Sequence, residues 1–197
     1  FIFKPTLSSL PVQFIIKKFL IIFITVFFLF PHNNYYSNLV AKTIDDYGLI
    51  SIMYHRFNES KYPSTNIQLD VFKNQLEVID NEGIKFVHPK NFKNSMSNNK
   101  GDRKILFTVD DGLLSFYENA WPILREKKIP FILFVNTREV GAFNYMSWEQ
   151  IIELHNSEYV EIGNHSHSHE YLADEDPEVI KDDILKSIEI FKNKLGR

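Results

Sequence analysis

The chain has 197 residues, a formal net charge of −3 and an apolar share of 44%, with 15% aromatic residues, and its pI is about 6.2. That length and apolar content suffice for one domain with a packed core, whereas the charge shows no basic excess that would favour a nucleic-acid partner. The sequence contains no cysteine, which excludes disulfides, thiolate metal sites and cysteine nucleophiles and leaves nitrogen and oxygen as metal ligands.

Residues 1–41 have the composition of an export signal. Lysines precede the apolar run FLIIFITVFFLF at 19–30, and no acidic residue occurs before Asp45. A run of this length is short for a membrane-spanning helix of about 20 residues, but it suits the hydrophobic region of a signal peptide, which has about 7–15 residues. We therefore expect a signal peptide and an exported protein that is extracellular, periplasmic or anchored at the cell surface. An uncleaved membrane anchor, and with it membrane association, is the first alternative, and a buried core helix is the second.

From Gly48 onward, short apolar runs alternate with segments of helical periodicity. The runs at 49–54, 84–87, 104–109, 131–135 and 159–163 predict strands. Strands that alternate with helices pair in parallel, so the sequence predicts an α/β domain, either a barrel or a doubly wound sheet. Both architectures place their chemistry at the carboxyl ends of the strands. The polar stretch from Asn91 to Asp102 predicts a loop.

Apolar stripes and end signals predict three helices. The first has its stripe at Leu69, Phe72, Leu76 and Ile79 and stops at Gly83. The second opens with a capping box formed by Ser147 and Gln150. The third has Asp176 as its cap, Pro177 in its first turn, a buried stripe at Ile180, Ile184, Ile188, Phe191 and Leu195, and Gly196 at its end.

Two adjacent carboxylates, Asp110-Asp111, directly follow the strand predicted at 104–109. Carboxylates that leave a buried strand lose hydration, which is costly unless a cation or hydrogen bonds compensate. The other acidic pairs, Asp45-Asp46 and Asp182-Asp183, lie after the export segment and on a helix surface, and we expect both to be solvated. A turn with a helix cap is the alternative interpretation of Asp110-Asp111.

Three histidines, His165, His167 and His169, follow the strand predicted at 159–163, so they belong at the same end of the domain as the acidic pair. If this segment forms a helical turn, His165 and His169 point the same way and His167 points elsewhere. Two imidazoles and one carboxylate suit Zn²⁺, Fe²⁺, Co²⁺ or Mn²⁺, with positions left open for catalysis. A polar surface loop or an adventitious metal patch is the alternative.

Both motifs resemble those of a known family. TVDDG at 108–112 is similar to the T-F-D-D-G first motif, and HSHSH at 165–169 to the H-[ST]-x-x-H second motif, of polysaccharide deacetylases with a NodB homology domain, carbohydrate esterase family 4. The stretch 121–141 resembles the family's helix and following strand, and MYHRF at 53–57 resembles the first strand of exported members. The resemblance implies a partial, distorted (β/α) barrel.

The resemblance further implies a metal-dependent hydrolase that removes N- or O-acetyl groups from an acetylated polysaccharide. It assigns Asp111, His165 and His169 as ligands of a divalent ion, with zinc expected first and cobalt, iron, manganese or nickel as alternatives. Asp110 is then the general base and the metal-bound water the nucleophile, whereas His167 falls on a variable position. An amidase acting on a small non-sugar amide and a membrane-anchored carbohydrate-binding pseudoenzyme are the competing functions.

The expected organisation is a signal or anchor at 1–41, a lead-in to the catalytic domain at 42–102 and an incomplete NodB homology domain at 103–197. The family's later motifs supply an arginine that orients the base and a histidine that acts as general acid, and neither has a counterpart after His169. We therefore expect the sequence to be truncated at Arg197. An incomplete and inactive domain is the alternative.

Overall fold

The computed structural model describes residues 48–97 and 102–196, and the predicted export segment lies outside them. The strands are β1 (Ile50–Tyr54), β2 (Arg56–Phe57), β3 (Asn66–Ile67), β4 (Lys85–Phe86), β5 (Lys104–Val109), β6 (Phe131–Val135) and β7 (Val160–Asn164). The helices are α3 (Leu69–Asn81), α4 (Phe92–Ser97), α5 (Leu114–Asn119), α6 (Trp121–Glu126), α7 (Trp148–His155) and α8 (Pro177–Leu195), with 3₁₀ turns η1 (Pro89–Asn91) and η2 (Leu172–Asp174). None of the helices in these two ranges is long and apolar enough to cross a membrane.

A parallel sheet forms the centre of the domain. β5 pairs with β1, with Tyr54 opposite Val109, and it also pairs with β6 and with the short β4. β6 pairs in turn with β7, so the strand order is β1-β5-β6-β7. The parallel pairing confirms the prediction from alternating strands and helices. The strands predicted at 104–109 and 131–135 have the observed bounds, and the other three differ by one residue at their ends.

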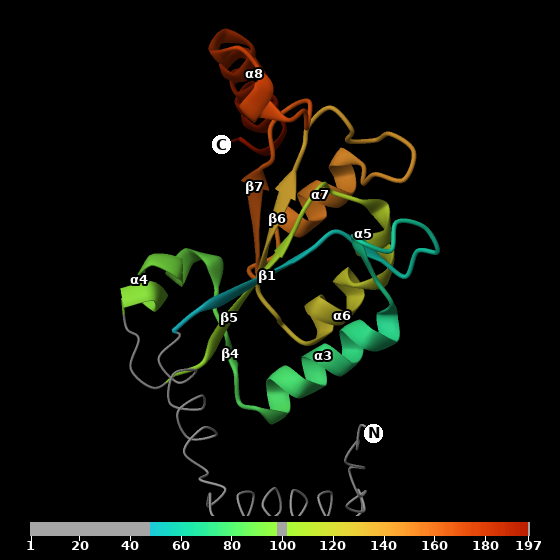
Figure 1. Ribbon diagram of the computed structural model, residues 1–197, viewed down its shortest axis with the longest axis vertical. Coiled ribbons are helices and arrows are strands. Elements are labelled where there is room, and N and C mark those ends of the chain that lie inside the picture. The colour runs from blue at the N-terminus through green and yellow to red at the C-terminus, as the bar shows by residue number, and fades with distance from the viewer. Residues whose placement is uncertain (1–47, 98–101, 197) are drawn as a thin grey trace, which may run out of the picture. The chain divides into compact units, whose positions relative to one another are not determined.

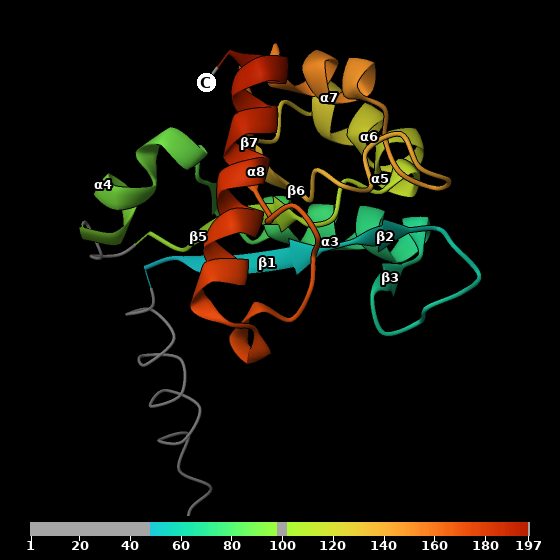
Figure 2. The same ribbon diagram turned by 90° about the horizontal axis from the view of Figure 1, so that it is seen from above.

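Four helices cover one face of this sheet. In Figure 1, α3, α5, α6 and α7 lie on the same side of the strands. The view from above shows α8 in front of the strands (Figure 2), and the Phe191 ring of α8 lies 6.0 Å from the Trp148 ring of α7. A doubly wound sheet has helices on both faces, whereas a barrel has them outside only. Within the described residues the sheet is open between β1 and β7, so the fold is a partial (β/α) barrel.

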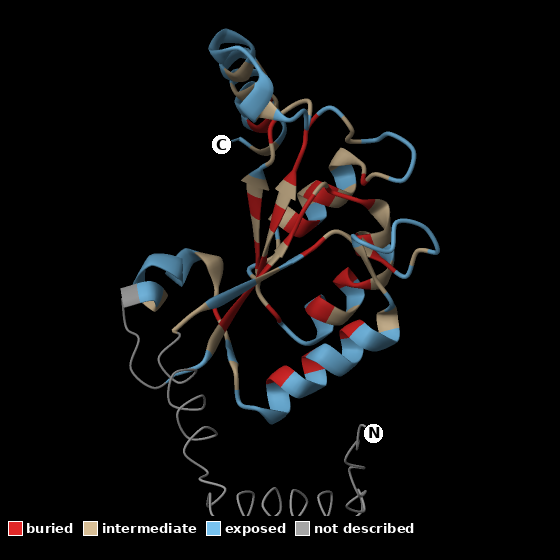
Figure 3. Cartoon of the chain, viewed as in Figure 1, coloured by how far each residue is buried: buried red, intermediate tan, exposed pale blue. Residues whose placement is uncertain are grey.

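The core lies between the sheet and these helices. Along β6, Phe131, Leu133 and Val135 are buried, while the alternate residues are partly exposed. This period of two is expected of a strand that packs one face (Figure 3). The Phe131 ring lies 5.3 Å from the Phe116 ring of α5 in an edge-to-face arrangement, which is a favoured aromatic geometry. Buried aromatic rings therefore join the sheet to its helix layer.

Several predicted helix signals are present in the structure. The hydroxyl of Ser147 accepts a hydrogen bond from the backbone N–H of Gln150, and the Gln150 side chain accepts one from the backbone N–H of Ser147, which completes the capping box of α7. Gly196 ends α8 with a left-handed φ of 76°, a conformation that glycine adopts without steric cost. The sequence therefore predicted both of these helix boundaries.

Three local predictions were wrong in whole or in part. The stretch from Asn91 to Asp102 contains the helix α4 at its start. Asp176 occupies the cap position of α8, but its side chain makes no capping hydrogen bond. In α8 it is Ser187 that is fully buried, whereas Ile188 is 47% exposed. The reason is that the Ser187 hydroxyl hydrogen-bonds to the Asn164 side chain of β7, which orients this face of the helix toward the sheet.

Candidate active site

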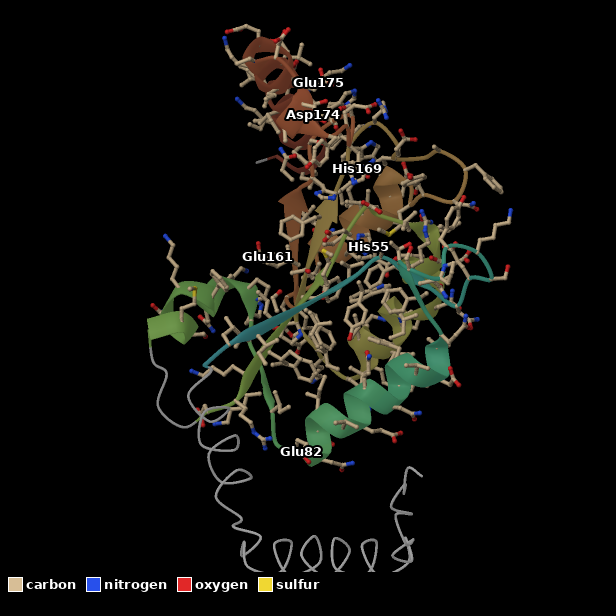
Figure 4. All side chains as sticks on the ribbon, viewed as in Figure 1. His55, Glu82, Glu161, His169, Asp174 and Glu175 are labelled. Carbon is tan, nitrogen blue, oxygen red and sulfur yellow. The ribbon has the colours of Figure 1, made fainter. Side chains whose placement is uncertain are left out.

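Polar residues follow the carboxyl ends of β1, β5 and β7, three parallel strands of the sheet. His55 follows β1, Asp110 follows β5, and His165 follows β7. Figure 4 shows His55 and His169 at the same end of the sheet, whereas Glu82 lies at the opposite end. This placement is expected, because parallel strands bring their carboxyl ends to one edge of a sheet.

A sharp turn after β5 presents the acidic pair. The backbone N–H of Asp110 donates to the carbonyl oxygen of Tyr54 at 2.9 Å, which extends the pairing with β1. Asp111 and Gly112 then take left-handed φ values of 74° and 71°, a conformation that costs a non-glycine residue about 1–2 kcal/mol. The turn lets both carboxylates face one histidine: Asp110 Oδ2 lies 4.0 Å and Asp111 Oδ1 lies 3.5 Å from Nε2 of His165.

The histidine motif forms a loop after β7, so the condition of a helical turn, on which the shared direction of His165 and His169 was based, is not met. Ser166 and His169 take left-handed φ values of 68° and 59°. The Asn164 side chain accepts from the backbone N–H of Ser166 at 2.8 Å, and the Ser166 hydroxyl accepts from the backbone N–H of His169 at 3.0 Å. The rings of His165 and His169 nevertheless lie 4.8 Å apart. Their convergence therefore comes from loop geometry and not from a spacing of four residues on a helix.

Asp111, His165 and His169 form a compact cluster of ligand atoms. Oδ1 of Asp111 lies 3.1 Å from Nε2 of His169 and 3.5 Å from Nε2 of His165. One ligand atom from each residue lies within 4.8 Å of the other two, an arrangement that could hold a metal ion. The His169 side chain is 50% exposed and the Asp111 side chain only 14%. The cluster is thus buried on the side of Asp111 and accessible from solvent on the side of His169.

The two carboxyl groups have different environments. Asp110 is 7% exposed, and its Oδ1 is buried without a hydrogen-bond partner among the described residues. Burial raises the pKa of Asp110, and the nearby His165 and His55 oppose this shift only in part. Burial also acts to raise the pKa of Asp111, but the imidazoles of His165 and His169 outweigh it and the pKa is lowered. A buried, unsatisfied carboxylate oxygen beside a cluster of two imidazoles and a carboxylate fits a divalent cation.

The other two histidines near the site differ in their contacts. Nδ1 of His167 lies 2.9 Å from the hydroxyl of Thr137, outside the cluster. His55, to which the sequence assigned no role, lies close enough for its charge to lower the pKa of both Asp110 and Asp111. In the sequence, its place after a strand and within the MYHRF segment at 53–57 were what distinguished it.

Sequence reasoning missed Asp183 as a residue of the site's surroundings. We expected the pair Asp182-Asp183 to be solvated, but the Asp183 carboxylate accepts hydrogen bonds from the backbone N–H groups of His167 and Ser168. Asp183 and Ser187 are four residues apart and share a helix face with Ile184. The signal available in the sequence was that Asp183 and Ser187 share a helix face with apolar residues, which indicates polar contacts with the rest of the domain.

Comparison with known proteins identifies the family. Residues 97–197, just over half of the chain, match the family model described as polysaccharide deacetylase. The chain belongs to the polysaccharide deacetylase family. This match confirms the family resemblance that the two motifs indicated.

Other comparisons agree with membership of this deacetylase family. The chain is 22% identical over 180 residues to the poly-β-1,6-N-acetyl-D-glucosamine N-deacetylase of Staphylococcus aureus, covering 77% of this chain and 62% of that protein. It is 29% identical to the solved structure of IcaB from Ammonifex degensii, with a TM-score of 0.67 over 76% of this chain and 70% of that one. The Streptococcus pyogenes deacetylase PplD in complex with acetate has the same fold, with a TM-score of 0.66 at 23% identity over the same shares of the two chains. The chain thus spans about 62% of the length of the first curated relatives.

Proposed function

We propose that this chain carries the catalytic centre of a metal-dependent hydrolase that removes acetyl groups from an N-acetylated polysaccharide. The observation that carries the proposal is the convergence of Asp111, His165 and His169, with the carboxylate of Asp110 4.0 Å from His165. The three converging side chains offer nitrogen and oxygen ligands, and family membership supports the hydrolase class.

The residues divide into two roles. Asp111, His165 and His169 would hold the ion, for which we propose zinc first. A bound divalent ion lowers the pKa of a water ligand and polarises an acetyl carbonyl. Asp110 would take the proton of the attacking water at Oδ2, the carboxylate oxygen that lies 4.0 Å from Nε2 of His165. His167 takes no part, because its Nδ1 faces Thr137.

The proposed substrate class comes from the relatives. The Staphylococcus aureus relative is named a poly-β-1,6-N-acetyl-D-glucosamine N-deacetylase, and we extend an N-acetylated sugar polymer to this chain. The half-exposed His169 at the rim of the cluster supports a large substrate that approaches from solvent. We further propose that the protein is exported, supported by the apolar run at 19–30. Cell fractionation with an antibody against the chain checks this, and recovery from the cytosol alone would contradict it.

The test of function is acetate release from poly-β-1,6-N-acetyl-D-glucosamine oligomers by the full chain loaded with Zn²⁺. We expect equal amounts of acetate and of new free amine, and a release that is about 10²- to 10⁴-fold slower in an Asp110→Asn variant. A small cyclic amide serves as the second substrate. Turnover of the cyclic amide alone would contradict the proposal in favour of an amidase. Binding of the oligomers without any acetate release would favour a carbohydrate-binding pseudoenzyme.

A further inference from the structure

Helix α8 holds the loop between the two histidine ligands through one carboxylate. Oδ2 of Asp183 accepts a hydrogen bond from the backbone N–H of His167 at 2.8 Å, and Oδ1 accepts one from the backbone N–H of Ser168 at 2.8 Å. His167 and Ser168 lie between His165 and His169 in the chain. A single side chain on a distant element therefore fixes two of the three residues that separate the proposed ligands.

One turn further along, α8 holds the start of the same loop. The Asn164 side-chain amide donates to the Ser187 hydroxyl at 2.6 Å, and Oδ1 of Asn164 accepts from the backbone N–H of Ser166 at 2.8 Å. Ser187 is fully buried, and its hydroxyl lies 2.9 Å from the carbonyl oxygen of Ile184. Residues four apart on a helix lie one above the other, so Asp183 and Ser187 form two supports on one face of α8.

The conformation of the loop explains why it needs these supports. Ser166 and His169 both have left-handed φ values, and such strained residues persist only where their surroundings determine them. Two adjacent backbone N–H groups that face one carboxylate form charge-assisted hydrogen bonds, which are about twice as strong as neutral ones. The hydrogen bonds lower the pKa of Asp183 against the opposing effect of burial. The N–H groups of the loop thus stabilise the ionised carboxylate form of Asp183.

We propose that Asp183 is a positioning residue that holds His165 and His169 in the geometry needed to bind the metal ion, with Ser187 as the second support. The proposal rests on the proposed function, because it assumes that these histidines are ligands. Asp183 itself touches neither the ligand atoms nor the reacting groups. Its effect passes through the backbone of His167 and Ser168.

The experiment compares Asp183→Asn with Asp182→Asn in the full chain. An asparagine at 183 can accept one of the two N–H groups but presents its own N–H₂ to the other. Asp182 is the neighbouring, exposed residue of the same helix, so its substitution makes the same change in net charge. We expect Asp183→Asn to weaken Zn²⁺ binding by about 10- to 100-fold, the usual effect of removing a residue that orients a ligand. Asp182→Asn should bind like the wild type. A competing fluorescent chelator measures both affinities.

A second readout on the metal-free chain separates this proposal from the proposed function. Amide hydrogen exchange at His167 and Ser168 should be faster in Asp183→Asn than in the wild type, while circular dichroism shows an unchanged fold. If the wild type binds no Zn²⁺, the proposed function fails, and unchanged exchange in the variant would separately overturn the positioning role. Wild-type affinity in a folded Asp183→Asn would also overturn it. So would global unfolding of the variant, because Asp183 would then support the whole domain rather than the loop.

Discussion

Asp110 and Asp111 are neighbours in the chain, yet their surroundings shift the pKa values of the two carboxyl groups in opposite directions. Burial dominates at Asp110 and raises its pKa, whereas the imidazoles of His165 and His169 outweigh burial at Asp111 and lower its pKa. A metal ligand has to stay ionised, while a general base has to accept a proton. The different surroundings of the two residues are therefore those that the two proposed roles require.

Replacing Asp110 with asparagine separates these roles. Asp110→Asn keeps the size of the side chain but removes the proton acceptor, so we expect Zn²⁺ affinity to stay unchanged. The kcat for acetate release should fall by about 10²- to 10⁴-fold, the usual contribution of general base catalysis. Metal titration and initial-rate kinetics measure the two quantities. Loss of Zn²⁺ binding in this variant would instead make Asp110 a ligand.

The histidines offer a matched pair of substitutions two residues apart. Nε2 of His169 lies 3.1 Å from Asp111 Oδ1, whereas the His167 ring faces the hydroxyl of Thr137. We expect His169→Ala to abolish Zn²⁺ binding and His167→Ala to retain both Zn²⁺ binding and most of the acetate release. Equilibrium dialysis followed by metal analysis checks the first outcome. Release of the ion by His167→Ala alone would show that the ligand assignment is wrong.

At the scale of elements, the sequence predicted those whose signal is local. β6 is a continuous apolar run, β5 is apolar from Ile105 to Val109 except for Thr108, and both have the predicted bounds. The capping box of Ser147 and Gln150 identified the start of α7 in the same way. The meeting of the Asp110-Asp111 turn with the histidine loop was also predictable, because parallel strands end at one edge of the sheet.

The remaining features depend on contacts between distant segments. The loop after β7 is held in left-handed conformations by Asn164, Ser166 and Asp183, and no local spacing encodes that conformation. For the same reason the burial of Ser187 in place of Ile188 follows from a partner 23 residues earlier in the chain. Helical periodicity alone predicted the more apolar residue at that position.

Contacts between α5, α6 and α7 give a pH-dependent prediction. Glu153 of α7 accepts hydrogen bonds from the Tyr117 hydroxyl and the Trp121 indole, and these lower its pKa. A lowered carboxyl pKa stabilises the fold above the unfolded-state value of about 4.3 and loses this effect as pH falls through the folded value. Because the side chain is 43% exposed, solvent screening limits the effect, and we expect Glu153→Gln to cost about 0.5–1 kcal/mol at pH 7.

Urea unfolding of Glu153→Gln at pH 7 and below pH 4 measures this difference. At the lower pH, the urea midpoint of Glu153→Gln should equal that of the wild type. Glu126→Gln, which changes an exposed carboxylate at the end of α6, is the control and should match the wild type at both values. A difference that persists at low pH would indicate a packing effect of the substitution rather than the ionised carboxylate.

At the scale of the whole domain, aromatic packing holds the sheet against its helix layer. Phe131 of β6 is fully buried, and its ring lies 5.3 Å from that of Phe116 in α5 and 5.9 Å from that of Trp121 in α6. The proposed site lies at the carboxyl ends of β5 and β7, the two strands that pair with β6. The positions of Asp110-Asp111 and of the histidine loop therefore depend on a core in which they take no part.

Phe131→Ala tests how much this core contributes. Removing a buried ring leaves a cavity in a close-packed interior, so we expect the free energy of unfolding to fall by about 3–5 kcal/mol. Phe143 is 90% exposed, and Phe143→Ala should change the free energy by less than about 0.5 kcal/mol. Urea denaturation gives both values, provided that the slope with urea concentration stays constant. Equal midpoints for the two variants would mean that other contacts hold the sheet against the helices, because Phe131, unlike the exposed Phe143, packs on α5 and α6.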